Sequence, residues 1–180
     1  MHRCATCFTL LLVAVLSSAC AEERAVPEQP ADAVGTPAAL EAPVVPPSPT
    51  HGGDGSEIEL LAVSAAQLET VDLPGELACT FEASTHGTLL VARADVLPDG
   101  AVRAVLNNNG YTEMLANGRA GGFNDLLDGI TLTGKGLTLR IARGDEKSTG
   151  DESTRHAAKL TVQRADGAER TYAGTWTCGP

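Results

Sequence analysis

The chain has 180 residues, a length that suits one domain or one domain with extensions. Its 23 acidic and 13 basic residues give a net charge of -10, which repels phosphate backbones and disfavours nucleic-acid binding. Aromatic residues make up only 3% of the chain, so surfaces built for aromatic stacking are not expected. No apolar run reaches the ~20 residues that a membrane-spanning helix needs.

The first twenty residues, MHRCATCFTLLLVAVLSSAC, have the parts of an export signal. Arg3 and the amino terminus are positive, and residues 8–16 form an apolar stretch too short to span a bilayer. Small residues then precede Cys20. This segment resembles the lipobox of bacterial lipoproteins, although Ser17 stands where lipoboxes usually have leucine or valine. The resemblance covers residues 1–20 only.

The resemblance implies that residues 1–19 are a signal peptide that is removed. Mature Cys20 then carries a diacylglyceryl thioether and an acylated amine, palmitate being one such acyl chain, and anchors the protein to a membrane. Ala21 is not the aspartate that retains lipoproteins at the inner membrane, which implies the outer membrane, facing the periplasm or the cell surface. The alternative is ordinary secretory cleavage at Ala19-Cys20-Ala21, which would release a soluble protein.

Residues 20–55 are predicted to be a disordered tether that begins at the lipidated cysteine. They contain seven of the ten prolines, which remove backbone donors and fix φ, so neither helix nor sheet propagates. By charge count the segment carries about -5. Such a segment stays extended and acts as a spacer.

Residues 56–180 are predicted to be an all-β domain, because apolar residues alternate with polar ones almost throughout. Turn sequences such as Asp99-Gly100 and Asn109-Gly110 separate the runs. We expect an antiparallel meander of about eight strands, closed as a small barrel or folded as a sandwich. A capping box at Ser64 predicts a short helix over 65–70, and 123–127 suits a further helical turn. The predicted strands are 76–83, 88–96, 101–107, 110–115, 129–133, 137–143, 157–164 and 169–178.

Cys79 and Cys178 are the only cysteines left in the mature chain besides Cys20. Both lie on the inward face, in the first and last predicted strands. In an oxidising envelope compartment they are expected to form one disulfide, which makes these two strands neighbours and favours a closed barrel.

Two polar turns, 107–111 and 117–125, and one aromatic residue supply the candidate ligand-binding side chains. Loops on a rigid β scaffold often bind ligands, but Asn and Gly also serve hairpin geometry alone. A tryptophan on an inward face belongs to the core unless the barrel leaves a cavity. The candidates are Asn108, Tyr111, Arg119, Phe123 and Trp176.

No metalloprotease, nucleophile-elbow or phosphate-loop motif is present, so no catalytic residue, metal or cofactor is predicted. His86 and His156 are the histidines on which a hydrolase would have to depend. The acidic loop 144–153 lacks EF-hand spacing and is interpreted as solvated.

The sequence therefore predicts a non-enzymatic binding or interaction module at the cell envelope, with an envelope protein or a cell-wall component as partner. A small one-disulfide β-barrel on a lipoprotein is also loosely similar in architecture to the lysozyme-inhibitor lipoproteins. That likeness implies the alternative function, inhibition of a basic hydrolase, toward which an acidic surface would steer. No residue is carried over from that family.

Overall fold

A computed structural model describes residues 47–119, 121–149 and 153–179. The predicted signal peptide, Cys20 and most of the predicted tether lie outside the described residues, as does the tip of the acidic loop at 150–152. Within the described ranges, no helix has both the length and the apolar character to cross a membrane.

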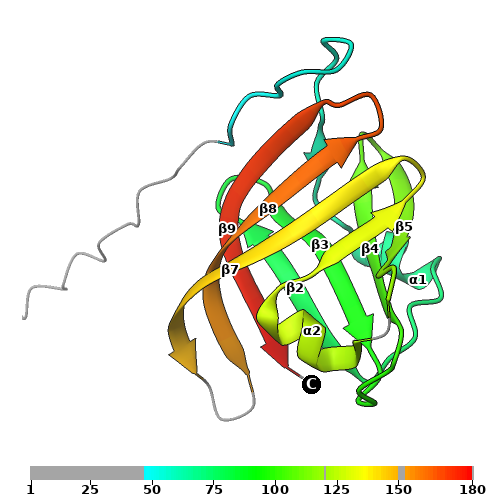
Figure 1. Ribbon diagram of the computed structural model, residues 1–180, viewed down its shortest axis with the longest axis vertical. Coiled ribbons are helices and arrows are strands. Elements are labelled where there is room, and N and C mark those ends of the chain that lie inside the picture. Colours follow the sequence, from blue (N-terminus) through cyan, green and yellow to red (C-terminus); the bar gives the residue numbers. More distant parts are fainter. Residues whose placement is uncertain (1–46, 120, 150–152, 180) are drawn as a thin grey trace, which may run out of the picture. The chain divides into compact units, whose positions relative to one another are not determined.

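Eight antiparallel strands, β2 to β9, form a closed barrel, so the structure is a barrel and not a sandwich (Figure 1). Each strand pairs with the next along the chain, and β2 pairs with β9 to complete the ring. All eight predicted strands are confirmed, most with end points shifted by one to three residues. The largest difference is at β7, which continues six residues further than predicted, to Thr149, into the segment predicted as the acidic loop 144–153. The elements are β1 (Leu60–Leu61), α1 (Ala65–Glu69), β2 (Leu77–Ala83), β3 (Gly87–Ala94), β4 (Val102–Asn108), β5 (Tyr111–Ala116), α2 (Gly122–Asp128), β6 (Thr131–Gly134), β7 (Leu137–Thr149), β8 (Thr154–Arg164) and β9 (Glu169–Gly179).

The inside of the barrel is filled by side chains. Alternate residues of each strand face inward, and the inward positions are apolar and buried. Phe81, Tyr172 and Trp176 are the largest of the fully buried residues, and small alanines of β3 and β4 make room for them. Tyr172 and Trp176 are therefore core residues, as the inward alternation of β9 indicates.

The disulfide joins the two strands that close the ring. Cys79 of β2 and Cys178 of β9 are direct cross-strand partners, and their sulfur atoms are bonded. The two cysteines are 99 residues apart in sequence, so the bond encloses nearly the whole domain. The predicted pairing and the predicted neighbourhood of the first and last barrel strands are confirmed.

One end of the barrel is crossed by a segment that we call the strap, residues 48–61. The backbone of Ser48 and of His51 bonds to β9, and β1 at the other end of the strap pairs with Asn107 and Asn108 of β4. Because β9 and β4 are three strands apart in the ring, the strap passes over the barrel end. The sequence predicted tether up to residue 55, whereas backbone pairing to the barrel begins at Ser48.

Buried contacts hold the strap in place. Ile58 and Leu60 are almost fully buried, and the Tyr172 hydroxyl donates to the Ile58 carbonyl and accepts from the Leu60 amide. At the barrel rim, the Arg164 guanidinium donates to the carboxylates of Asp54 and Asp166 at 2.7 and 2.6 Å. The strap is thus bound by both core contacts and an ion-pair cluster.

The predicted N-terminal helix is confirmed as α1, which begins with the expected capping box of Ser64 and Gln67. The Gln67 side chain also bonds to Thr112 and Asn107, so α1 lies on the outside of β4 and β5. Val105 faces outward on β4 and is nevertheless fully buried, in agreement with a cover over this part of the sheet.

Removing the disulfide is expected to destabilise the barrel. The Cys79→Ala, Cys178→Ala variant loses the cross-link that limits the unfolded chain, so we expect the free energy of unfolding to fall by about 2–5 kcal/mol. Guanidinium unfolding followed by the fluorescence of Trp176, the single tryptophan, measures the loss. Reduced wild type should match the variant, and an unchanged midpoint in both would contradict the prediction.

Acid is expected to loosen the strap at Asp54. Hydrogen bonds from the Ser56 hydroxyl and amide, and then from Arg164, lower the pKa of Asp54 from the usual 3.8 to about 2. Because folding lowers this pKa, the carboxylate stabilises the strap above pH 3.8, and its contribution is lost as the pH falls toward 2. An NMR titration of the Asp54 carboxyl and the Ser56 amide should give a midpoint near 2, and Asp54→Asn should abolish the Ser56 transition. A midpoint near 3.8 would refute the account.

Candidate functional site

The other end of the barrel is covered by α2, which extends the helical turn predicted at 123–127. Leu126 is fully buried, and Phe123 and Leu127 pack against the core. The indole nitrogen of Trp176 donates to the Leu126 carbonyl at 2.8 Å, which fixes the helix to β9. The two ends of the barrel are therefore closed by different segments, the strap at one and α2 at the other.

A glycine at its first residue allows α2 to begin close to the neighbouring backbone. Gly122 has a φ of +55°, and its amide donates to the Gly100 carbonyl at 3.0 Å. A Cβ at this position would collide with the carbonyl oxygen of Leu97. Glycine is required here both for the positive φ and for the close approach.

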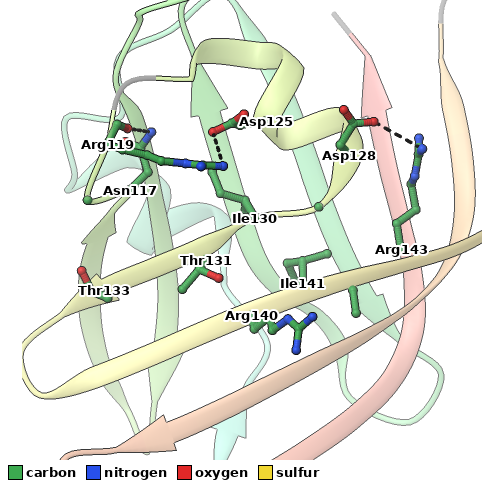
Figure 2. A pocket seen from close by; sticks show the side chains of 13 residues that line it. Asn117, Arg119, Asp125, Asp128, Ile130, Thr131, Thr133, Arg140, Ile141 and Arg143 are labelled. Atoms are coloured by element: carbon green, nitrogen blue, oxygen red, sulfur yellow. Dashed lines mark hydrogen bonds and ion pairs between the residues drawn. The ribbon is translucent and has the colours of Figure 1, made fainter.

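A groove lies on the outside of the barrel, between α2, the turn after β5, and the strands β6 and β7 (Figure 2). Its volume is about 760 Å³. Two of its lining residues, Ile130 and Ile141, belong to the buried core of the barrel, and most of the others are polar or charged. The lining side chains are those of Asn117, Arg119, Asp125, Asp128, Ile130, Thr131, Thr133, Arg140, Ile141, Ala142 and Arg143, with Gly118 and Gly129 completing it.

Three arginines meet at this groove, and α2 supplies carboxylates to two of them. Arg119 pairs with Asp125 at 3.4 Å, and Arg143 pairs with Asp128 at 3.3 Å. Arg140 is exposed, and its side chain forms neither an ion pair nor a hydrogen bond with any of the described residues. The lining thus has three cations against two anions in a chain whose net charge is -10.

The turn that carries Arg119 is held by Asn117. The Asn117 side-chain oxygen accepts from the Val102 amide at 3.0 Å, and its side-chain nitrogen donates to the Arg119 carbonyl. These bonds tie the turn both to the start of β4 and to itself. Arg119 is therefore displayed from a fixed loop, in agreement with the general placement of binding residues on a rigid scaffold.

The structure separates the five candidate residues predicted from sequence. Arg119 lies in the groove, Phe123 packs partly into the core, and Trp176 is fully buried. Asn108 and Tyr111 flank the β4–β5 turn, at the opposite end of β5 from the groove. The predicted set therefore does not form one site.

Sequence reasoning missed Arg140 and Arg143. Strand alternation does place Arg140 on the outer face, opposite the apolar Leu139 and Ile141. Nothing in the pattern of β7 indicates that the turn after β5 and the end of α2 come to lie beside it. That juxtaposition follows from barrel closure.

The two histidines of the domain lie at different ends of the barrel. His86 is in the β2–β3 turn, with its ring edge-on to Tyr172. The sequence placed His156 in a loop before a strand, but β8 begins at Thr154, so His156 faces inward beside Trp176 and is only 5% exposed. Its Nε2 lies 3.5 Å from the Arg143 guanidinium. The pair of histidines forms no common site.

Within the described ranges, no group of three or more His, Cys, Asp or Glu residues has a geometry suited to a metal ion. The chain matches no known protein family, no curated protein and no solved structure. Its function is therefore inferred from the geometry of its own residues.

Gly122→Ala is expected to displace α2 and distort the groove. The new Cβ meets the Leu97 carbonyl and the backbone keeps a positive φ, so we expect a loss of about 1–3 kcal/mol in the free energy of unfolding. Trp176 fluorescence should also shift, because its indole bonds to Leu126 of α2. Gly118→Ala is the matched control, since no atom lies within 4 Å of its Cβ position. Equal stability of the two variants would contradict the assignment.

Proposed function

We propose that this protein is a lipid-anchored, non-enzymatic binding module of the cell envelope, and that it binds through the groove outside the barrel. The proposal joins the lipobox-like signal, with Cys20 as the lipidated residue, to the geometry of the folded domain. The outer membrane is the proposed site of the anchor.

One observation carries the proposal: the barrel interior is filled, while the arginine-lined groove is open on the outside. Fully buried core residues, Trp176 among them, occupy the space that a ligand inside a barrel would need. A hollow of about 760 Å³ is within the size range of sites for small ligands. Binding on the outer surface is therefore the arrangement that the described residues favour.

The attachment of the strap supports this arrangement. The described chain begins beside the first residues of β9, where Ser48 bonds to Thr171. Helix α2 packs near the other end of the same strand, at Trp176. The strap therefore attaches near the start of β9, at the opposite end of that strand from α2.

The charges of the groove suit binding more directly than catalysis. Its titratable groups are arginines and aspartates, and four of the five are engaged in ion pairs. An arginine stays charged at all physiological pH values and does not exchange protons in a reaction. These side chains are suited to holding an anion.

Inhibition of a basic hydrolase is the second candidate function. It is favoured by the net charge of -10 and by the closed one-disulfide barrel, the architecture on which the loose likeness to lysozyme-inhibitor lipoproteins rests. Lysozyme activity measured against increasing amounts of this chain tests it. Inhibition that survives changes in the groove would favour this second function over the first.

The experiment that tests the first function is retention on envelope material. A Cys20→Ser chain, which carries no lipid, is incubated with washed cell walls and outer-membrane fragments, and bound protein is measured. We expect retention to be lost in Arg140→Glu, because charge reversal in the groove repels an anionic partner. It should persist in Arg93→Glu, an equal change on β3, which is four strands from β7 in either direction around the ring. Equal retention of the two variants, or none of the parent chain, would contradict the proposal.

A further inference from the structure

We propose that the groove binds an acidic carbohydrate, whose oxyanion pairs with Arg140 and whose hydroxyl groups bond to the threonines beside it. The inference rests on the proposed function, since it assigns a ligand class to the same groove. Three observations support it: the unpaired charge of Arg140, the rows of threonines on the outer face of the sheet, and the two neighbouring hollows.

Arg140 differs from the other basic residues around the groove because its side chain is not paired with an acidic residue among those described. A second hollow of about 470 Å³ adjoins the groove and shares Thr133 with it. Its cations are engaged, since Lys135 pairs with Glu113 at 2.8 Å and Arg164 lies in the rim cluster. Arg119 and Arg143 of the groove are paired as well. Of the five cations that line the two hollows, Arg140 alone lacks an acidic partner among the described residues.

A guanidinium without a partner suits an oxyanion. Its planar fork donates two parallel hydrogen bonds to a carboxylate or phosphate, and such charge-assisted bonds are stronger than neutral ones. Arg140 lies on the outer face of β7 and lines the groove together with Thr131 and Thr133 of β6 (Figure 2). An anion that bonds to Arg140 therefore lies next to threonine hydroxyls.

The threonines form rows across the sheet. Arg140 stands directly opposite Thr131 of β6 and Thr161 of β8, and Thr161 is opposite Thr171 of β9. In the next row, Thr133 of β6 is opposite Thr138 of β7. Threonine is stiff at χ1, so these hydroxyls are held in few orientations. A hydroxyl both donates and accepts, which is the bonding capacity that sugar hydroxyls match.

The two hollows are neighbours on the sheet, since Thr133 lines both of them. A ligand longer than one sugar that starts in the groove would extend toward Thr138 and Gln163 of the second hollow. A single small anion would use Arg140 alone and leave the threonine rows and the second hollow unoccupied. An oligosaccharide with an acidic group would contact Arg140, the threonine rows and the second hollow together.

A peptide or protein partner fits this surface less well. Protein interfaces depend on apolar or aromatic anchors, whereas the two isoleucines that line the groove are buried in the core of the barrel. The net charge of -10 disfavours a polyanion as densely charged as nucleic acid, while a glycan with at most one carboxylate per sugar is repelled less.

The test is calorimetric titration of the full chain in detergent micelles with tetragalacturonic acid. Its methyl ester is the matched neutral probe, and inorganic phosphate is the free anion. We expect the acid to bind at least about tenfold more tightly than the ester, because the ester cannot pair with Arg140. Phosphate should bind far more weakly than the acid. An ester that binds equally, or phosphate that binds as tightly as the acid, would overturn the carbohydrate assignment.

Substitutions test whether these residues bind the acidic oligosaccharide. Arg140→Gln should weaken binding about tenfold or more, and Thr131→Val, which removes only a hydroxyl, about two- to tenfold. Asp128→Asn should strengthen it about two- to fivefold, since it frees Arg143 for the ligand. Arg93→Gln is the matched control and should bind as wild type. Unchanged affinity of Arg140→Gln would overturn the inference.

Failure of this inference can be told from failure of the proposed function. If tetragalacturonic acid does not bind at millimolar concentration while Arg140→Glu still abolishes retention on envelope material, the carbohydrate class is wrong and the binding function stands. If the acid binds through Arg140 while envelope material is not retained, the proposed function fails and the ligand chemistry stands. Unaltered Trp176 fluorescence in each variant shows that the fold is intact.

Discussion

The pairing of β2 with β9 is the contact on which the rest of this structure depends. The other neighbouring strands of the ring are also neighbours in sequence and are joined by short connections, the longest of which contains α2 between β5 and β6, so they meet at little cost in chain entropy. The β2–β9 pair brings together residues almost a hundred positions apart, and there the Cys79–Cys178 bond lies. The covalent link is thus placed at the one long-range pairing of the ring, where it limits the unfolded chain most.

Closure of the ring determines how the interior and the two ends are built. A closed sheet has no free edge along its sides, but an eight-stranded barrel leaves an interior that side chains must fill. Trp176 and Tyr172 do so, and each also fixes a cover through a polar atom. The Trp176 indole bonds to α2, and the Tyr172 hydroxyl bonds to the strap. The two scarce large aromatics of β9 thereby connect the core to both ends of the barrel.

The sequence predicted correctly those elements whose formation depends on residues close together in the chain. Alternation of apolar residues, turn dipeptides and the capping box at Ser64 depend on near neighbours, and they predicted the strands and α1 closely. The cysteines added one long-range contact. The strap up to residue 55 was missed because Pro49 and three glycines give it the composition of a linker, although the same strap places Ile58 and Leu60 in the core. The site was mostly missed for a different reason: Arg119 and Arg140 are 21 positions apart in sequence and meet only after the ring has closed.

The aspartates of α2 explain how three arginines coexist at one groove. Like charges in a confined space repel, and this repulsion would oppose the docking of α2 and of the turn after β5 on β7. Asp125 and Asp128 offset the charge of Arg119 and Arg143, and both belong to the helix that must dock there. With two of the three cations neutralised internally, the groove keeps one positive charge, on Arg140, in a protein that is otherwise acidic. That charge is too small to attract anions over a distance, so recognition depends on the short-range hydrogen bonds that the threonine rows supply.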